Sequence, residues 1–185
     1  MQTSLAPRRP SRRQRGVTLI ETTVATAVVA IAAGAVAPGL TTLRSHQAVA
    51  SAAAEFETDV AHVRSLAVTT GTTWRITFEA AQGRSCYVIH TGAAGDCPCL
   101  DSPQPVCADG MPALKRAAFG TSGHAVALAS NVGSMAFDGI KGTSTPAGTV
   151  RIAARDGAAV HQVVNVMGRV RSCSPNRSIG GFKAC

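Results

Sequence analysis

The sequence predicts an α+β fold, in which one long N-terminal helix is followed by a domain built on a mainly antiparallel β-sheet. Residues 17–37 form a run of twenty-one small, apolar or hydroxyl side chains that only Glu21 interrupts. Beyond it, apolar residues recur at helical spacing up to residue 67 and then alternate at strand spacing. A helix packed on an antiparallel sheet is the simplest architecture that buries both patterns.

Charge is distributed unevenly along the 185 residues, whose net charge is +8. Residues 1–16 contain five arginines and no acid, residues 17–138 are net negative, and residues 139–185 carry seven Lys or Arg against Asp156 alone. If the first sixteen residues are removed, the remaining positive charge therefore lies almost wholly at the C-terminal end. A chain of this length predicts one domain with an appended segment.

The apolar run has the length of a membrane span. As a helix it would extend roughly 32 Å, against about 30 Å for a hydrocarbon core. The arginines before it stay on the cytoplasmic side, so the chain after Pro38 lies across the membrane. A cleaved signal peptide or a permanent anchor explains this length but not Glu21, whose carboxylate costs about 2.5 to 3.5 kcal/mol at mid-bilayer and less near the interface.

Gly16 followed by Val17-Thr18-Leu19-Ile20-Glu21, after a short basic leader, resembles the prepilin signature of type IV pilins and type II secretion pseudopilins. The resemblance implies that a prepilin peptidase cuts after Gly16 and that Val17 becomes the methylated N-terminus. It also implies that Glu21 serves in filament assembly, its charge offset by the N-terminal amine of a neighbouring pilin. Val17 stands where phenylalanine is usual, which weakens helix packing without preventing cleavage.

An amphipathic helix is predicted after Pro38 and ends at Thr70-Gly71. Its apolar face consists of Val49, Ala53, Phe56, Val60, Val63 and Ala67. Its water-facing side is predicted to hold Glu55, Glu57, Asp59, His62 and Arg64.

Strands are predicted where apolar residues alternate. The first carries Trp74, Ile76 and Phe78, and a second follows a turn at Gln82-Gly83. Further strands are expected within residues 125–128, 135–137, 150–154 and 162–166.

Three stretches resemble the GspH/FimT family of minor pilins and pseudopilins: residues 59–67, residues 135–142 and, above all, Gly168-Arg169-Val170-Arg171. With the prepilin start, the resemblance covers nearly the whole chain and implies a type IV pilin-like fold. It divides the chain into a cleaved leader (1–16), a transmembrane or filament helix (17–40), an amphipathic helix (41–70), a β-rich domain (71–167) and a basic C-terminal tail (168–185).

No catalytic constellation is apparent, so we expect neither an enzyme nor a cofactor. The cysteines Cys86, Cys97, Cys99 and Cys107 fall in a loop rich in Pro, Gly and Asp. Zinc is conceivable there, but the spacing Cys97-Pro98-Cys99 is not that of a zinc knuckle, and an exported chain favours disulfides. We therefore predict no metal site, and the pairing among these four cysteines stays open.

A further disulfide is predicted between Cys173 and Cys185, which enclose eleven polar, glycine-rich residues. The last eighteen residues also hold Arg169, Arg171, Arg177 and Lys183 with no acid. In an extended segment the first two arginines point the same way, about 7 Å apart, a spacing that suits adjacent phosphates. Lys141 and Arg151 are candidates for extending this set.

Two functions follow. Resemblance to FimT implies a minor pilin that binds extracellular double-stranded DNA without sequence preference through this tail, during natural transformation. The alternative is a purely structural GspH-like pseudopilin of the type II secretion system, or a subunit that primes pilus assembly. Either way, we expect the bacterial inner membrane first, with the C-terminal domain in the periplasm, and then a pilus or pseudopilus.

Overall fold

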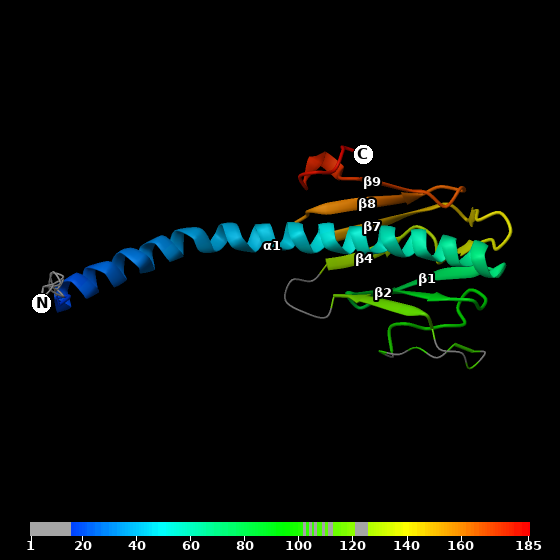
Figure 1. The fold of residues 1–185 in the computed structure, drawn as a ribbon, viewed down its shortest axis with the longest axis horizontal. Helices are drawn as coiled ribbons and strands as arrows, with labels where there is room; N and C mark the ends of the chain where they lie inside the picture. Colours follow the sequence, from blue (N-terminus) through cyan, green and yellow to red (C-terminus); the bar gives the residue numbers. More distant parts are fainter. Residues whose placement is uncertain are drawn as a thin grey trace, which may run out of the picture. The chain divides into compact units, whose positions relative to one another are not determined.

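The computed structural model describes residues 16–101, 103, 105, 107–108, 110, 113–120 and 126–185 (Figure 1). The chain divides into two compact units, Met1–Leu40 and Thr41–Cys185. One helix, α1, covers Leu19–Thr70 and ends where Gly71 adopts a φ of +65°, a left-handed conformation that glycine tolerates. The predicted end of the helix is confirmed.

In the first unit, the apolar side chains of α1 at residues 19–34 and at Leu40 are exposed to solvent; Leu19, for example, is 83% exposed. The hydroxyls of Thr22, Thr23 and Thr26 donate to backbone carbonyls three or four residues earlier, over 2.7 to 2.8 Å. These polar groups are therefore satisfied within the helix itself. Within the described residues, no one helix has both the length and the apolar composition to cross a membrane, although the segments Leu19–Gly34 and Gly39–Thr70, separated by a bend, meet both conditions together.

The second unit contains two antiparallel sheets, where the sequence predicted one (Figure 1). The five-stranded sheet has the order β3-β2-β1-β5-β6 and the four-stranded sheet the order β4-β7-β8-β9. The strands are β1 (Trp74–Ala81), β2 (Arg84–His90), β3 (Lys115–Phe119), β4 (Val126–Ser130), β5 (Ser134–Phe137), β6 (Ser144–Thr145), β7 (Gly148–Ala154), β8 (Ala159–Val164) and β9 (Val170–Cys173), and a 3₁₀ turn follows at Pro175–Arg177.

The predicted α+β class, with a long N-terminal helix and antiparallel strands, is confirmed. The strand expected within residues 162–166 begins earlier, at Ala159, and it ends at Val164 because residues 165–169 form the turn before β9. Ala125, expected to begin a strand, lies outside the described residues. Strands β3, β6 and β9 were not predicted.

The core lies between α1 and the two sheets. All six residues of the predicted apolar helix face are fully buried, and they pack with residues of both sheets such as Tyr87, Met135 and Ile152. The prediction that Asp59 faces water is wrong, because this side chain is only 7% exposed and is held by Tyr87 and Lys115. Arg64, also predicted to face water, is half-buried.

The cysteine-rich segment after β2 is braced by two disulfides, Cys86–Cys99 and Cys97–Cys107. With Val88, these four cysteines form a small second core. His90 lies close to the Cys97–Cys107 sulfurs, and Glu79 lies close to the Cys86–Cys99 sulfurs. In each disulfide the two sulfurs are bonded to each other and are therefore not available as thiolate ligands for a metal. A third disulfide joins Cys173 to Cys185.

Candidate nucleic-acid interface

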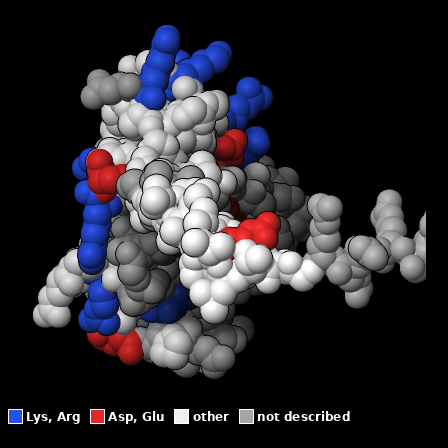
Figure 2. Space-filling model, turned by 90° about the vertical axis from the view of Figure 1, so that its left-hand side faces the viewer, with Lys and Arg blue, Asp and Glu red and all other residues white. Residues whose placement is uncertain are grey.

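The four basic residues singled out in the C-terminal tail lie on consecutive parts of one structure. Arg169 ends the turn between β8 and β9, Arg171 lies on β9, Arg177 ends the 3₁₀ turn and Lys183 follows it. All four are exposed, and none forms an ion pair with any other residue that the structure describes. Figure 2 shows Lys and Arg side chains gathered at the top of the view, over the C-terminal part of the four-stranded sheet.

The turn before β9 sets the position of Arg169. The amide oxygen of Asn165 accepts hydrogen bonds of 3.0 Å from the backbone N–H groups of Met167 and Arg169, and the backbone N–H of Asn165 donates to the Arg169 carbonyl, also over 3.0 Å. Gly168 completes the turn with a φ of +68°. Since side chains alternate along an extended segment, Arg169 and Arg171 share one side of it, roughly 7 Å apart.

The segment after β9 is folded back and ordered. Besides the Cys173–Cys185 bridge, the hydroxyl of Ser174 donates to the Ala159 carbonyl over 2.9 Å and accepts from the Ile179 N–H over 3.1 Å. The Ser174 N–H donates to the Lys183 carbonyl over 2.8 Å, and Ile179 is buried. The backbone that carries Arg177 and Lys183 is therefore anchored to β8 and β9.

Of the two residues considered as extensions of the basic set, Arg151 lies on the same sheet. It is exposed on β7 opposite His161, which is itself opposite Cys173 on β9. Lys141 is exposed in the turn between β5 and β6, in the other sheet. Strand pairing thus places Arg151 on the same sheet as Arg171, two strands away, and Lys141 lies on a separate loop.

Arg64 on α1 joins the three stretches that carry the sequence resemblance. Its Nε donates to the Gly142 carbonyl over 3.1 Å. A Cβ added to Gly168 would lie 2.9 Å from Arg64 Cδ, and one added to Gly142 would lie 2.9 Å from Val68 Cγ2. Only glycine lets both loops approach the helix this closely. Sequence reasoning missed this role of Arg64, although the recurrence of glycine in both loop motifs was the available signal.

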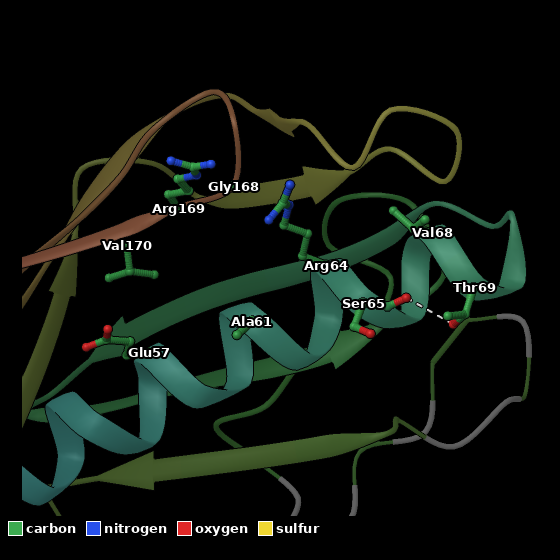
Figure 3. A pocket seen from close by; sticks show the side chains of 9 residues that line it. All are labelled: Glu57, Ala61, Arg64, Ser65, Val68, Thr69, Gly168, Arg169 and Val170. Atoms are coloured by element: carbon green, nitrogen blue, oxygen red, sulfur yellow. Dashed lines mark hydrogen bonds between the residues drawn. The ribbon is translucent and has the colours of Figure 1, made fainter.

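An open groove of about 570 Å³ lies beside this junction (Figure 3). Apolar side chains line it together with two guanidinium groups, one carboxylate and two hydroxyls. The lining residues are Glu57, Ala61, Arg64, Ser65, Val68, Thr69, Gly168, Arg169 and Val170.

The family model described as "Type II transport protein GspH" matches residues 52–168, and that of the "Prokaryotic N-terminal methylation motif" matches residues 11–37. No curated protein matches the chain. Among solved structures, the type IV minor pilin FimU of Pseudomonas aeruginosa strain PAO1 is similar with a TM-score of 0.50 and 18% identity, over 70% of this chain and 93% of FimU. A second crystal form of FimU gives a TM-score of 0.46 and 20% identity, over 68% and 95%.

The first FimU structure shows that the two chains share a fold. At 18% sequence identity, the similarity is evidence for the fold alone. The GspH match spans most of the chain, from the second half of α1 through β8 to Gly168 in the turn before Arg169, and it ends before β9. The chain therefore belongs to the GspH family and has the fold of a type IV pilin.

Proposed function

We propose that this protein is a minor type IV pilin that binds extracellular duplex DNA during natural transformation. The observation that carries the proposal is the cluster of Arg169, Arg171, Arg177 and Lys183, exposed, free of ion pairs among the described residues and held on an ordered backbone. Guanidinium and ammonium groups that already have carboxylate partners would be poor phosphate ligands, whereas these four are available.

Binding at such a cluster is electrostatic. Aromatic side chains, which would stack on unpaired bases, lie mostly inside the core, where Phe56, Phe78, Tyr87 and Phe119 pack together. Contacts are therefore to the phosphate backbone, without sequence preference, and they weaken steeply with salt because each neutralised phosphate releases counterions.

The experiment is a fluorescence anisotropy titration of a labelled 30-base-pair duplex with residues 41–185, which contain the entire core and all three disulfides. The variant R169A/R171A removes the two principal contacts. The matched control is R44A/R84A, which removes two exposed arginines elsewhere and changes the net charge equally. We expect the first variant to lose most DNA retention at low salt and the control to keep it; equal retention by both variants would refute DNA binding at this site.

A second candidate is a structural pseudopilin of the type II secretion system, which the description of the matching family favours. In that case protein contacts carry the function and the basic tail is incidental. The two candidates separate on the same titration, because a purely structural subunit has no need to retain DNA at low ionic strength.

We also propose that prepilin peptidase cuts after Gly16, that Val17 is methylated, and that the chain rests in the inner membrane before it joins other pilins in a filament. The methylation-motif match across residues 11–37 supports this. Intact-mass measurement of membrane-extracted protein tests it. An N-terminus at Val17 carrying one added methyl group is expected, whereas an N-terminus at Pro38 would mean ordinary signal-peptide cleavage.

A further inference from the structure

The groove beside Arg64 holds binding groups that the tail cluster does not include. Arg64 projects from α1 toward the turn that carries Gly168 and Arg169 (Figure 3). Its Nε is engaged by Gly142, but its two terminal nitrogens make no hydrogen bond or ion pair with the residues that the structure describes. Arg169 lines the same groove and is equally unpaired. Two guanidinium groups with free N–H donors therefore line the same groove.

The rest of the groove is suited to a sugar more than to a second charge. Ala61, Val68 and Val170 provide apolar surface, and Ser65 and Thr69 provide hydroxyls. The one acidic side chain among the lining residues is Glu57, whose Oε2 accepts a 3.0 Å hydrogen bond from the Ser172 hydroxyl. In Figure 3, Val170 lies between Glu57 and Arg169, and no ion pair joins the carboxylate to either guanidinium.

We propose that this groove is a further sugar–phosphate subsite, in which Arg64 and Arg169 hold one backbone phosphate and the apolar lining residues contact the adjacent deoxyribose. The inference rests on the proposed DNA binding and extends it from the tail onto α1. Arg169 is the link, because it belongs both to the groove and to the row that continues through Arg171 on β9. Planar guanidinium groups suit this role because each can donate two parallel hydrogen bonds to a phosphate.

Charge complementarity selects this occupant. Two guanidinium groups with free terminal N–H donors in one groove favour an anion. Glu57, whose carboxylate accepts the Ser172 hydrogen bond, weakens that preference without cancelling it. It follows that Arg64 should contribute to DNA affinity and that Glu57 should reduce it.

The test measures DNA affinity of residues 41–185 by anisotropy between 50 and 300 mM NaCl, with three single variants. Arg64→Met removes the charge while keeping an unbranched chain against Gly168. Arg75→Met is its matched control, since Arg75 is also half-buried and also donates from Nε to a loop carbonyl, that of Gly92 over 3.2 Å, but lies on β1 outside the groove. Glu57→Gln removes the acid and keeps an acceptor for Ser172.

We expect Arg64→Met to weaken binding about threefold to tenfold and to reduce the slope of log K against log [salt] by about 1, as loss of one phosphate contact should. Arg75→Met should leave that slope unchanged. Glu57→Gln should strengthen binding about twofold or threefold, since a repelling charge is lost. This last variant also decides the question if Arg64→Met proves unfolded by circular dichroism.

The failures are distinguishable. If R169A/R171A loses DNA while Arg64→Met keeps the wild-type slope and Glu57→Gln keeps the wild-type affinity, the groove is no subsite and the tail alone binds. If the unaltered fragment does not retain duplex DNA at 50 mM NaCl, the proposed function itself is overturned, and the groove inference with it.

Discussion

The hydroxyl of Tyr87 on β2 donates a hydrogen bond of 2.5 Å to Oδ2 of Asp59 on α1. The ammonium group of Lys115 on β3 lies 2.7 Å from that oxygen, 2.8 Å from the other oxygen of Asp59 and 2.8 Å from Glu55. A carboxylate on the buried side of the helix is thus satisfied by two neighbouring strands. The cluster stabilises the packing of α1 on the five-stranded sheet and sets the register between them.

Removing the Asp59 carboxylate should destabilise the fold more than removing the Tyr87 hydroxyl or the Glu55 charge. Asp59→Ala leaves a buried hydroxyl and a half-buried ammonium group without their main partner, and we expect a loss of about 3 to 5 kcal/mol in the free energy of unfolding. Tyr87→Phe should cost about 1.5 to 3 kcal/mol. Glu55→Gln, at the exposed end of the cluster, should cost under about 1 kcal/mol. Urea denaturation of residues 41–185 measures all three, and equal losses would contradict the order.

The same cluster predicts that the folded state becomes less stable at alkaline pH. Burial, then the hydrogen bond to Asp59 and the nearby carboxylate charges, raises the pKa of Tyr87 well above the ordinary value of 10.0. Above pH 10 the unfolded chain loses this phenolic proton while the folded chain keeps it. Stability is therefore fully present below pH 10 and falls above it, by up to about 1.4 kcal/mol per pH unit.

Lys115 acts in the same direction. Burial works to lower the pKa of its ammonium group, but the hydrogen bonds to Asp59 and Glu55 prevail and raise it above the ordinary 10.5. Denaturation midpoints of wild type and Tyr87→Phe between pH 9 and 11 provide the check. The variant should show the shallower decline, and parallel curves would exclude the tyrosine as the cause.

A side chain at Gly168 should destabilise the fold. In Gly168→Ala a strained φ of +68° is combined with a methyl group 2.9 Å from Arg64 Cδ. Gly157→Ala is the control, because φ is +90° there but no atom lies within 4 Å. The strained backbone alone costs about 1 to 2 kcal/mol. Thermal unfolding should show a larger loss at Gly168 than at Gly157, and anisotropy should show reduced DNA affinity for Gly168→Ala alone.

Opening the C-terminal bridge should reduce both stability and DNA affinity. The double variant C173S/C185S releases a loop whose closure contributes roughly 3 kcal/mol by chain entropy. Arg177 and Lys183 then lose their fixed positions, whereas Arg169 and Arg171 precede the bridge and keep theirs. We expect a smaller affinity loss than for R169A/R171A; a loss as large would place the principal contacts inside the loop.

Glu21 should matter for assembly and not for binding. If Glu21 pairs with the N-terminal amine of a neighbouring pilin, as the prepilin resemblance implies, Glu21→Ala in the full chain should lower the amount of protein recovered in sheared filaments. Total membrane protein, measured by immunoblot, should stay unchanged. If the variant is recovered in filaments as well as the wild type, Glu21 is not required for assembly.

The sequence predicted local features well. All six residues that helical periodicity assigned to the apolar face of α1 are buried, and the helix ends at the predicted Thr70-Gly71 boundary. Both predictions succeeded because residue spacing and glycine conformation are local properties. Asp59 was misplaced because Tyr87 and Lys115, which bury it, are distant in sequence. Strand β3 was missed because it opens with Lys115 and Arg116 instead of apolar residues.

The site was only half predictable. The tail cations could be read from composition, since no acid separates them. The part played by Arg64 depends on loops that close onto α1 from more than seventy residues away, through the Gly142 carbonyl and Gly168. Spacing alone could not decide the pairing of the four cysteines near β2, because several connectivities fit so short a segment.

β9 is the outermost strand of its sheet, and its far side has few backbone partners in the described chain. Such a border invites the strand of another molecule to pair with it, and charged side chains are a common protection against that. Arg169 and Arg171 are charged side chains at this border, and their positive charges would repel those of a second copy. Their neutral replacements should therefore be accompanied by lysine versions, which retain the repulsion, so that self-association is not mistaken for lost DNA binding.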